Sequence, residues 1–239
     1  MHSKINSFIF KFLQKLLLSR GYYGIDDDLT LSFAQSGEDS ILRSFFINKE
    51  NGFYVDVGAY HPKRYSNTYI FYLKGWRGIN IDANPGSMKL FEKYRSKDIN
   101  LELGIGTRKG KKMFYTFAEP AFNTFSKGIL RYRQNRLRRK NRKIPVQIYP
   151  LADVLDKYLP QNNEIDFLSI DVEGMDMDVL RSNNWKKYRP KIIIIEDLLF
   201  LPEHSTKSTI YTYLHSLGYT LVAYTTLSLF FKDTTIQKV

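Results

Sequence analysis

Acidic side chains follow four apolar stretches of the sequence, at the point where each stretch ends. Asp56 follows FYV, Asp82 follows GINI, Asp171 follows FLSI, and Glu196 and Asp197 follow a run of four isoleucines. One acid after an apolar strand usually caps the next helix. Four such ends indicate a binding site rather than four separate helix caps, because open α/β sheets bind ligands beyond the carboxyl ends of their parallel strands. The pattern therefore predicts a polar site at one edge of a sheet.

The first two acids have the spacing of a nucleotide-binding fold. Asp82 lies 26 residues after Asp56, where such folds place an acid on the ribose hydroxyls. Gly58 gives the backbone room to approach a ligand. The turn continues AYHPKR and lacks the further glycines that a pyrophosphate cofactor needs. This disfavours NAD and FAD and suits a nucleoside ligand without phosphates, such as S-adenosylmethionine.

Alternating strand and helix patterns with short connections position these acids, and they predict an α/β fold with a mostly parallel sheet covered on both faces. The continuous isoleucine run indicates a strand buried on both sides. A helix is expected after Ser36, which is a plausible N-cap. Further strands are expected at 53–59, 77–84, 99–106, 110–117, 165–171 and 190–197, further helices at 66–75, 85–95, 175–185 and 208–219, and an antiparallel hairpin at 220–224 and 227–233.

Length and composition fit one domain with an N-terminal appendage. The 239 residues include no cysteine, which excludes a disulfide scaffold, a thiolate zinc site and a cysteine nucleophile. Residues 1–30 are expected to form an amphipathic helix and linker, and residues 31–239 the main domain. The apolar run of the appendage is interrupted by charges and is too short to span a bilayer. It either packs on its own domain or lies on a membrane surface or a partner.

The positive charge is concentrated in a basic insertion at 127–143. This segment holds nine Lys or Arg and no acid, so the rest of the chain carries 12 − 9 = +3. A solvated loop is one interpretation. The others are contact with a phosphate-bearing substrate, a nucleic acid or an anionic membrane.

Several motifs, taken together and in order, resemble the FkbM family of S-adenosylmethionine-dependent methyltransferases. They are SGEDSIL, GFYVDVGAYHPKRYSNTYIFYLKGWRGINIDANP, EPAFNTFS and IDFLSIDVEGMDMDVLRSNNWKKYRPKIIIIE, which together extend from about Phe33 to Glu196. The resemblance implies the class I methyltransferase fold, which is Rossmann-like, with a seven-stranded, mostly parallel sheet and an antiparallel last strand. Members are mostly O-methyltransferases, and bacterial ones often modify sugars.

The resemblance also implies a set of cofactor-binding residues. Asp56 and Gly58 would form the cofactor turn with the adjoining Ala59 and Tyr60. Asp82 would hold the ribose, with Asn84 close to the adenosine. Ser66 matches a serine that binds the methionine carboxylate in catechol-type O-methyltransferases. Gln35, Gly37 and Glu38 lie in a family motif expected to cover the cofactor.

His61, Asp171 and Glu196 are candidates for the chemistry on the acceptor hydroxyl. His61 has an ordinary pKa near ~6.5 and could take the proton, or it merely caps its turn. Asp171 could act as the base, hold the sugar, or bind a metal. By resemblance to the catechol-type enzymes, Asp171, Glu196 and Asp197 could bind a divalent, Mg²⁺-type ion, since hard cations prefer oxygen ligands. The pair Glu196-Asp197 differs here from the Asp-Asn pair of the catechol-type enzymes.

The sequence thus predicts a cytoplasmic O-methyltransferase that uses S-adenosyl-L-methionine on a sugar hydroxyl. The expected substrate is a nucleotide sugar or a surface glycan of the capsule or O-antigen type, as in polysaccharide biosynthesis. A nucleic-acid partner is not expected, because the basic segment contains only Tyr132 as a stacking aromatic. Peripheral contact with the inner membrane and a homo-oligomer stay open. The alternatives are an RNA methyltransferase and a non-catalytic glycan-binding or membrane-associated protein.

Overall fold

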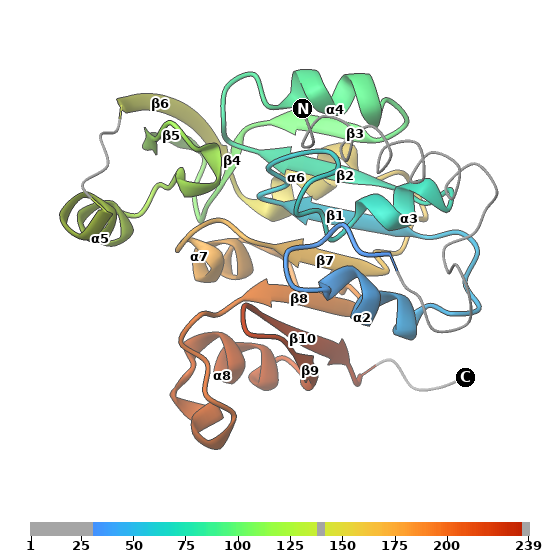
Figure 1. Cartoon of the computed structure of the whole chain (residues 1–239). Coiled ribbons are helices and arrows are strands. Elements are labelled where there is room, and N and C mark those ends of the chain that lie inside the picture. Colours follow the sequence, from blue (N-terminus) through green and yellow to red (C-terminus); the bar gives the residue numbers. More distant parts are fainter. Residues whose placement is uncertain (1–30, 138–141, 236–239) are drawn as a thin grey trace, which may run out of the picture.

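The main sheet has seven strands in the order β3-β2-β1-β7-β8-β10-β9 (Figure 1). The computed structural model describes residues 31–137 and 142–235. Strands β3, β2, β1, β7 and β8 are parallel, and β10 runs antiparallel to both β8 and β9. The bounds are β1 Phe53–Val57, β2 Arg77–Asp82, β3 Ile99–Glu102, β7 Phe167–Ile170, β8 Ile192–Glu196, β9 Tyr219–Tyr224 and β10 Ser228–Asp233. The predicted parallel sheet with an antiparallel strand near its end, the class I methyltransferase arrangement, is confirmed.

Helices cover both faces of this sheet because its central strands are apolar on both sides. In β8, Ile193 and Ile195 pack against one set of helices, and Ile192 and Ile194 against the other. This confirms the burial expected from the isoleucine run. The first set comprises α6 Leu151–Tyr158, α7 Asp176–Arg181 and α8 Thr209–Ser216, and the second includes α2 Glu38–Phe45 and α3 Tyr69–Leu73, with α4 Met88–Tyr94 beside β3.

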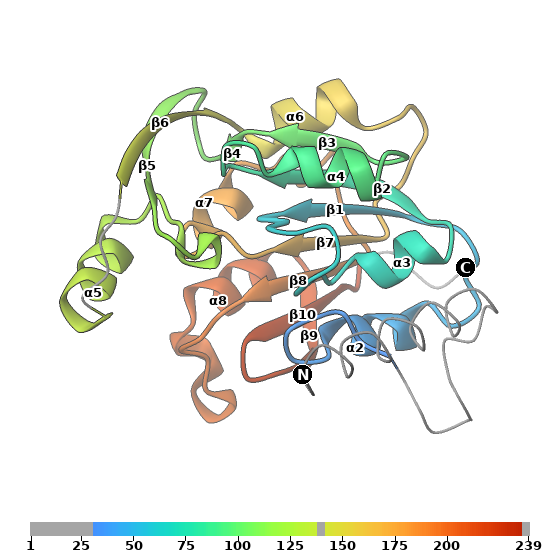
Figure 2. The same cartoon turned by 45° about the horizontal axis from the view of Figure 1, so that its top comes forward.

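A second, three-stranded sheet in the order β4-β6-β5 stands beside the main sheet (Figure 2). The strand expected at 99–106 is divided between the two sheets, because Leu103 separates β3 from β4. The strand expected at 110–117 lies at the edge of the small sheet. Two elements of this region were not predicted, the helix α5 and the strand β6. The bounds are β4 Gly104–Ile105, β5 Gly110–Thr116, the short 3-10 helix η1 Pro120–Phe122, α5 Lys127–Leu137 and β6 Arg142–Tyr149.

The basic insertion is therefore not a loop throughout. Residues 127–137 are helical and β6 begins at 142, while residues 138–141 lie outside the described part. We call residues 104–149 the basic lobe. The predicted N-terminal amphipathic helix at 1–30 also lies outside the described residues, and the division at residue 30 stays a prediction.

Two local differences concern helix boundaries. Helix α2 begins at Glu38 after Gly37, whose backbone is left-handed at φ +82°, so Gly37 and not Ser36 occupies the N-cap position. A second 3-10 helix, η2, covers Pro202–Lys207 before α8. None of the helices in the described ranges is both long enough and apolar enough to cross a membrane.

Candidate functional site

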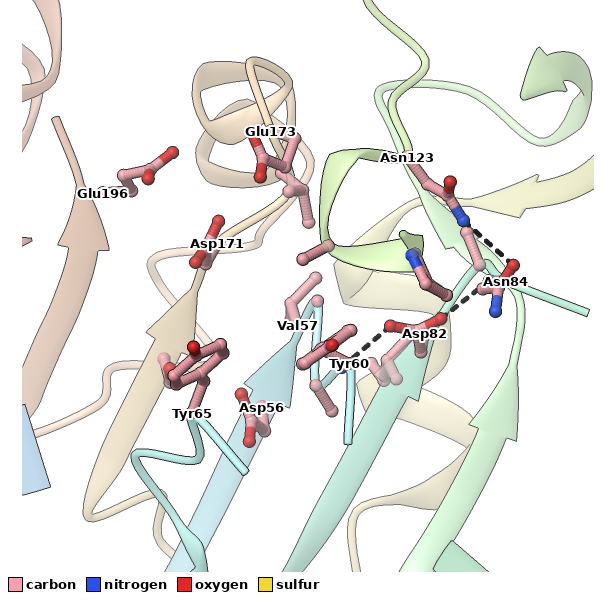
Figure 3. A pocket seen from close by; sticks show the side chains of 18 of the residues that line it. Asp56, Val57, Tyr60, Tyr65, Asp82, Asn84, Asn123, Asp171, Glu173 and Glu196 are labelled. Atoms are coloured by element: carbon pink, nitrogen blue, oxygen red, sulfur yellow. Dashed lines mark hydrogen bonds between the residues drawn. The ribbon is translucent and has the colours of Figure 1, made fainter. Parts of the chain in front are cut away.

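A cavity of about 560 Å³ lies where β1, β2, β7 and β8 end (Figure 3). This volume is within the ~300–1,000 Å³ that ligand sites usually have. One wall comes from the strand ends and the loops that follow them. The other wall comes from the basic lobe, chiefly residues 119–123. The cavity thus occupies the edge of the sheet at which the acids were expected to converge.

The turn after β1 brings the backbone of two strands very close together. Gly58 has φ +90°, and a side chain here would place its Cβ 1.7 Å from the carbonyl oxygen of Asp171. The amides of Gly58 and Ala59 both donate to the carbonyl of Ile81, at 2.9 and 3.0 Å. Only glycine fits this approach, and its role is to bring the ends of β1, β2 and β7 to one cavity.

Asp82, at the end of β2, is held by backbone amides. Its two carboxylate oxygens accept from the amide of Tyr60 at 2.9 Å and from the amide of Asn84 at 2.7 Å. Burial raises the pKa of Asp82, and these amide bonds oppose the rise. Asn84 in turn accepts a hydrogen bond from Asn123 of the basic lobe, at 3.0 Å. Figure 3 shows these hydrogen bonds beside the cavity. This arrangement fixes the orientation of the Asp82 carboxylate at the cavity wall.

Asp56 is held from the opposite side by a buried polar network. Its carboxylate accepts from the hydroxyl of Thr68 at 2.7 Å, and that hydroxyl accepts from the guanidinium of Arg95 at 2.9 Å. Arg95 is completely buried and pairs with Asp98 at 2.9 Å. Tyr54 donates to Asp98 and accepts from Arg95, both at 2.6 Å. Burial raises the pKa of Asp56, and the charge of Arg95 opposes that rise most.

Three further carboxyl groups form the wall of the cavity beyond β7 and β8. Burial, then repulsion from Glu196, raises the pKa of Asp171 well above its usual range. Burial and the charge of Glu173 raise the pKa of Glu196 to about 8. Glu173 is paired with Arg133, which reaches it from α5 and also donates to the carbonyl of Phe122. Near neutral pH this wall can therefore hold or accept a proton.

Most of the predicted site residues share this cavity. Those that line it are Gln35, Glu38, Asp56, Gly58, Ala59, Tyr60, Asp82, Asn84, Asp171 and Glu196. His61, Ser66 and Asp197 do not line it. Each of these three has a local structural role.

His61 caps its own turn. Its Nδ1 accepts from the amides of Lys63 and Arg64, at 3.1 and 3.0 Å, so this nitrogen is already used. Burial, with repulsion from Arg64 and Lys63, lowers the pKa of His61. The ring is therefore neutral near pH 7. The geometry favours the structural alternative that the sequence left open over the role of base.

Ser66 is buried at the start of α3. Its hydroxyl accepts from the amide of Tyr69 at 3.1 Å, and it lies within 3.2 Å of the hydroxyl of Thr68. It therefore closes the turn that leads into the helix. Its predicted contact with a methionine carboxylate is not supported by this position.

Asp197 does not line the cavity, and its carboxylate holds the loop after β8. Its carboxylate accepts from the hydroxyl of Ser208 at 2.6 Å and from the amide of Leu199 at 3.3 Å. Across residues 31–137 and 142–235, no three His, Asp or Glu side chains are grouped so that they could hold a metal ion. The predicted Asp171, Glu196 and Asp197 centre is not assembled, because the loop uses one of its three ligands.

Several cavity residues were not singled out from the sequence. Tyr65 lines the cavity, is 45% exposed, and lies stacked 6.3 Å from the ring of Tyr60. Tyr60 and Tyr65 have positive φ values, 52° and 54°, a conformation that costs a non-glycine residue energy and that clusters at functional sites. Arg64 lies over the ring of Tyr65 at 4.6 Å. The motif EPAFNTFS pointed to the Asn123 region, but only the fold shows that Asn123 meets Asn84.

The sheet order and the antiparallel β10 are those of the class I methyltransferase fold, and comparison with known proteins identifies the family. The model of the methyltransferase FkbM domain matches residues 56–221, more than half of the chain. The chain therefore belongs to the FkbM family of S-adenosylmethionine-dependent methyltransferases. A comparison with curated proteins finds no match.

Solved structures with a similar chain trace are distant in sequence. The C-terminal domain of precorrin-6Y C5,15-methyltransferase from Rhodobacter capsulatus is 11% identical, with a TM-score of 0.42, and covers 87% of this chain and 91% of its own. The enzyme of the same name from Geobacter metallireducens is 12% identical, with a TM-score of 0.41, and covers 87% and 95%. A methyltransferase from Geobacter sulfurreducens is 11% identical, with a TM-score of 0.40, and covers 98% and 96%.

Proposed function

We propose that this methyltransferase transfers its methyl group to a sugar hydroxyl, and that Asp171 is the base. The observation that carries the proposal is that one cavity is lined both by Asp56 and Asp82, which we assign to the nucleoside, and by Asp171, a carboxyl group with a raised pKa. Figure 3 shows Asp82 on one side of this cavity and Asp171 and Glu196 on the other.

The half of the cavity around Asp82 fits the family's cofactor. The carboxylate of Asp82 can accept hydrogen bonds from both ribose hydroxyls, and two backbone amides set the orientation of this carboxylate. Tyr60, Ala83 and Asn84 line the same part, and the turn offers no glycine-rich cradle for phosphates. S-adenosylmethionine, when bound, supplies an electrophilic methyl group on a sulfonium sulfur. The negatively charged walls of the cavity also suit a cationic sulfonium.

Asp171 is the group best placed to receive a hydroxyl proton. A sugar hydroxyl is a poor nucleophile, so a base that takes its proton speeds the reaction. An efficient base has a pKa near the working pH. Burial and Glu196 move the pKa of Asp171 upward in this sense. Glu196 can share the proton, since its own pKa is about 8.

The acceptor half suits a polar, ring-shaped molecule. Carboxyl groups of Asp171, Glu173 and Glu196 can accept hydrogen bonds from sugar hydroxyls. The 45% exposed ring of Tyr65 also lines the cavity and can contribute an aromatic contact to a sugar ring. Arg64 is a basic side chain on the cavity wall, and in a nucleotide sugar it could pair with the diphosphate. The proposed acceptor is therefore a nucleotide sugar or a cell-surface glycan. We propose that the reaction takes place in the cytoplasm.

Two measurements test this proposal. Calorimetry should show that the chain binds S-adenosylmethionine and that Asp82→Ala binds it at least about tenfold more weakly, as loss of a hydrogen bond to a charged group implies. Transfer of a labelled methyl group is then measured with nucleotide sugars, glycans and RNA, with and without EDTA. Turnover of RNA alone would refute the sugar acceptor, and Asp171→Asn with full turnover would refute the base.

A further inference from the structure

The basic lobe carries the whole net charge of the protein. Residues 104–149 contain 13 Lys or Arg and one acid, Glu119, which gives 13 − 1 = +12. The remaining residues contain 36 − 13 = 23 basic and 24 − 1 = 23 acidic residues and are neutral as a whole. Glu119 itself accepts a hydrogen bond from Tyr60. The net positive charge is thus confined to one segment of the sequence, of which residues 104–137 and 142–149 stand beside the cavity.

Among the lobe residues whose side chains the structure describes, most basic side chains face solvent. Exposed ones are present on the β4–β5 connection, on β5, on α5 and on β6, namely Arg108, Lys109, Lys111, Lys127, Arg131 and Lys143. Arg133, in contrast, is buried and ties α5 to Glu173 and Phe122. This anchor fixes the helix on the cavity wall, and Figures 1 and 2 show α5 beyond the end of the main sheet. The lobe therefore presents a fixed cationic surface.

An apolar loop stands at the same end of the sheet, after β8. Leu198, Leu199 and Leu201 are 58%, 90% and 52% exposed. Hydrogen bonds hold the loop in place, since the Asp197 carboxylate accepts from the hydroxyl of Ser208 and from the amide of Leu199. Phe200 points inward and packs on Tyr211 and Tyr224. The loop therefore holds three leucines out into solvent, which is unfavourable unless something apolar covers them.

We propose that this end of the molecule docks on an anionic lipid bilayer. Cationic side chains attract the charged headgroups, and the leucines enter the boundary between headgroups and acyl chains. The positive charge of the lobe favours an anionic partner. The exposed leucines favour a lipid bilayer over a purely polar polyanion, because only the bilayer offers an apolar interior. RNA fits less well, because single-stranded RNA binding relies on stacking aromatics next to the basic groups. On α5, Tyr132 is the exposed aromatic.

This docking surface does not depend on the methyl-transfer reaction. The cavity lies between its two parts, since residues 119–123 of the lobe form one wall and Glu196, just before the leucine loop, another. Docking would therefore bring the cavity to the bilayer surface. If the proposed function also holds, on which this last step rests, the acceptor is a saccharide attached to a lipid.

The test uses the full chain and sedimentation with lipid vesicles. Vesicles are made of phosphatidylcholine alone or of phosphatidylcholine mixed with phosphatidylglycerol. Two double variants probe the surface, Leu198→Asn with Leu199→Asn and Lys127→Gln with Arg131→Gln. Controls remove matched groups at the amino end of the strands, where Ile47 is 77% exposed and Lys97 and Lys186 are exposed. They are Ile47→Asn and Lys97→Gln with Lys186→Gln.

The wild type should bind the anionic vesicles and release them as salt rises. The lysine–arginine variant should bind them at least about tenfold more weakly, because each basic residue near such a surface contributes roughly fivefold. The leucine variant should also bind them more weakly, because it loses the apolar area that enters the bilayer boundary. The controls should bind like the wild type. Failure of the wild type to bind, or surface variants that bind equally well, would overturn the proposal. So would a loss of RNA binding in the lysine–arginine variant without a loss of vesicle binding. Calorimetry with S-adenosylmethionine reports separately on the proposed function.

Discussion

Replacing Thr68 by valine tests the buried network that holds Asp56. Valine has nearly the same shape as threonine but no hydroxyl, so the substitution removes the contacts to Asp56 at 2.7 Å and to Arg95 at 2.9 Å. All three side chains are buried. A hydrogen bond to a charged group contributes about 1.5–3 kcal/mol, and an orphaned buried group costs about 1–3 kcal/mol. We therefore expect the free energy of unfolding to fall by about 2–4 kcal/mol near neutral pH.

The size of this loss should depend on pH in a defined direction. Burial raises the pKa of Asp56 above its unfolded value, and the Thr68 hydroxyl and Arg95 limit that rise. A carboxyl group with a raised folded-state pKa disfavours folding once the pH exceeds its unfolded pKa of about 3.9. Without the hydroxyl, the pKa of Asp56 rises further and this penalty grows. The destabilisation should therefore be smaller near pH 4 and larger near neutral pH.

Urea denaturation at both pH values measures the effect, with Thr68→Ser as the matched control. Serine keeps the hydroxyl and loses one methyl group, so it should cost only about 0.5–1.5 kcal/mol at either pH. If Thr68→Val costs less than Thr68→Ser, or costs the same near pH 4 as near neutral pH, the network does not act on the charge of Asp56. In that case Thr68 serves only to fill the space under α3.

Three further substitutions test the cavity. Gly58→Ala should unfold the turn or abolish S-adenosylmethionine binding in calorimetry, since its Cβ would lie 1.7 Å from the Asp171 carbonyl oxygen. The control Gly86→Ala, at φ +82° with open space around it, should lower the free energy of unfolding by only about 1–2 kcal/mol. Equal effects of the two substitutions would refute the steric argument. Glu196→Gln removes a charge that raises the pKa of Asp171, so the acidic limb of the kcat–pH profile should move to lower pH, and an unmoved limb would remove Asp171 as the titrating base. His61→Asn should keep kcat within about threefold, because asparagine can accept the same amide bonds, whereas a loss of about a hundredfold would make His61 the base.

The sequence predicted the sheet and its ligand edge because both depend on local patterns. Each apolar run with a following acid specifies a strand and its polar end, and alternation with helices makes the strands parallel. Asp56, Asp82 and Asp171 were found in this way, and all three line the cavity. The hairpin at the end of the chain was also predicted, and β9 and β10 confirm it. The order of the strands in the sheet follows from long-range pairing and not from the sequence pattern.

The structure of the basic segment could not be predicted from local sequence patterns. Its nine basic residues were compatible with a solvated loop, and the periodicity of α5 is weak because most of that helix faces solvent. What holds α5 in place is Arg133, which reaches Glu173, 40 residues further along the chain. No local signal separates this arginine from its neighbours. Asn123 is similar, since its partner Asn84 is 39 residues away.

The sequence by itself determined the family, the strand-end acids and the concentration of charge, because these are properties of residue type and spacing. The tertiary structure decided which acids share a site. Asp171 and Glu196 face the cavity, whereas Asp197, next in sequence to Glu196, is held by Ser208. Adjacent residues at a strand end point to opposite sides of the chain, and only the packing of the loop after β8 decides which side is the cavity.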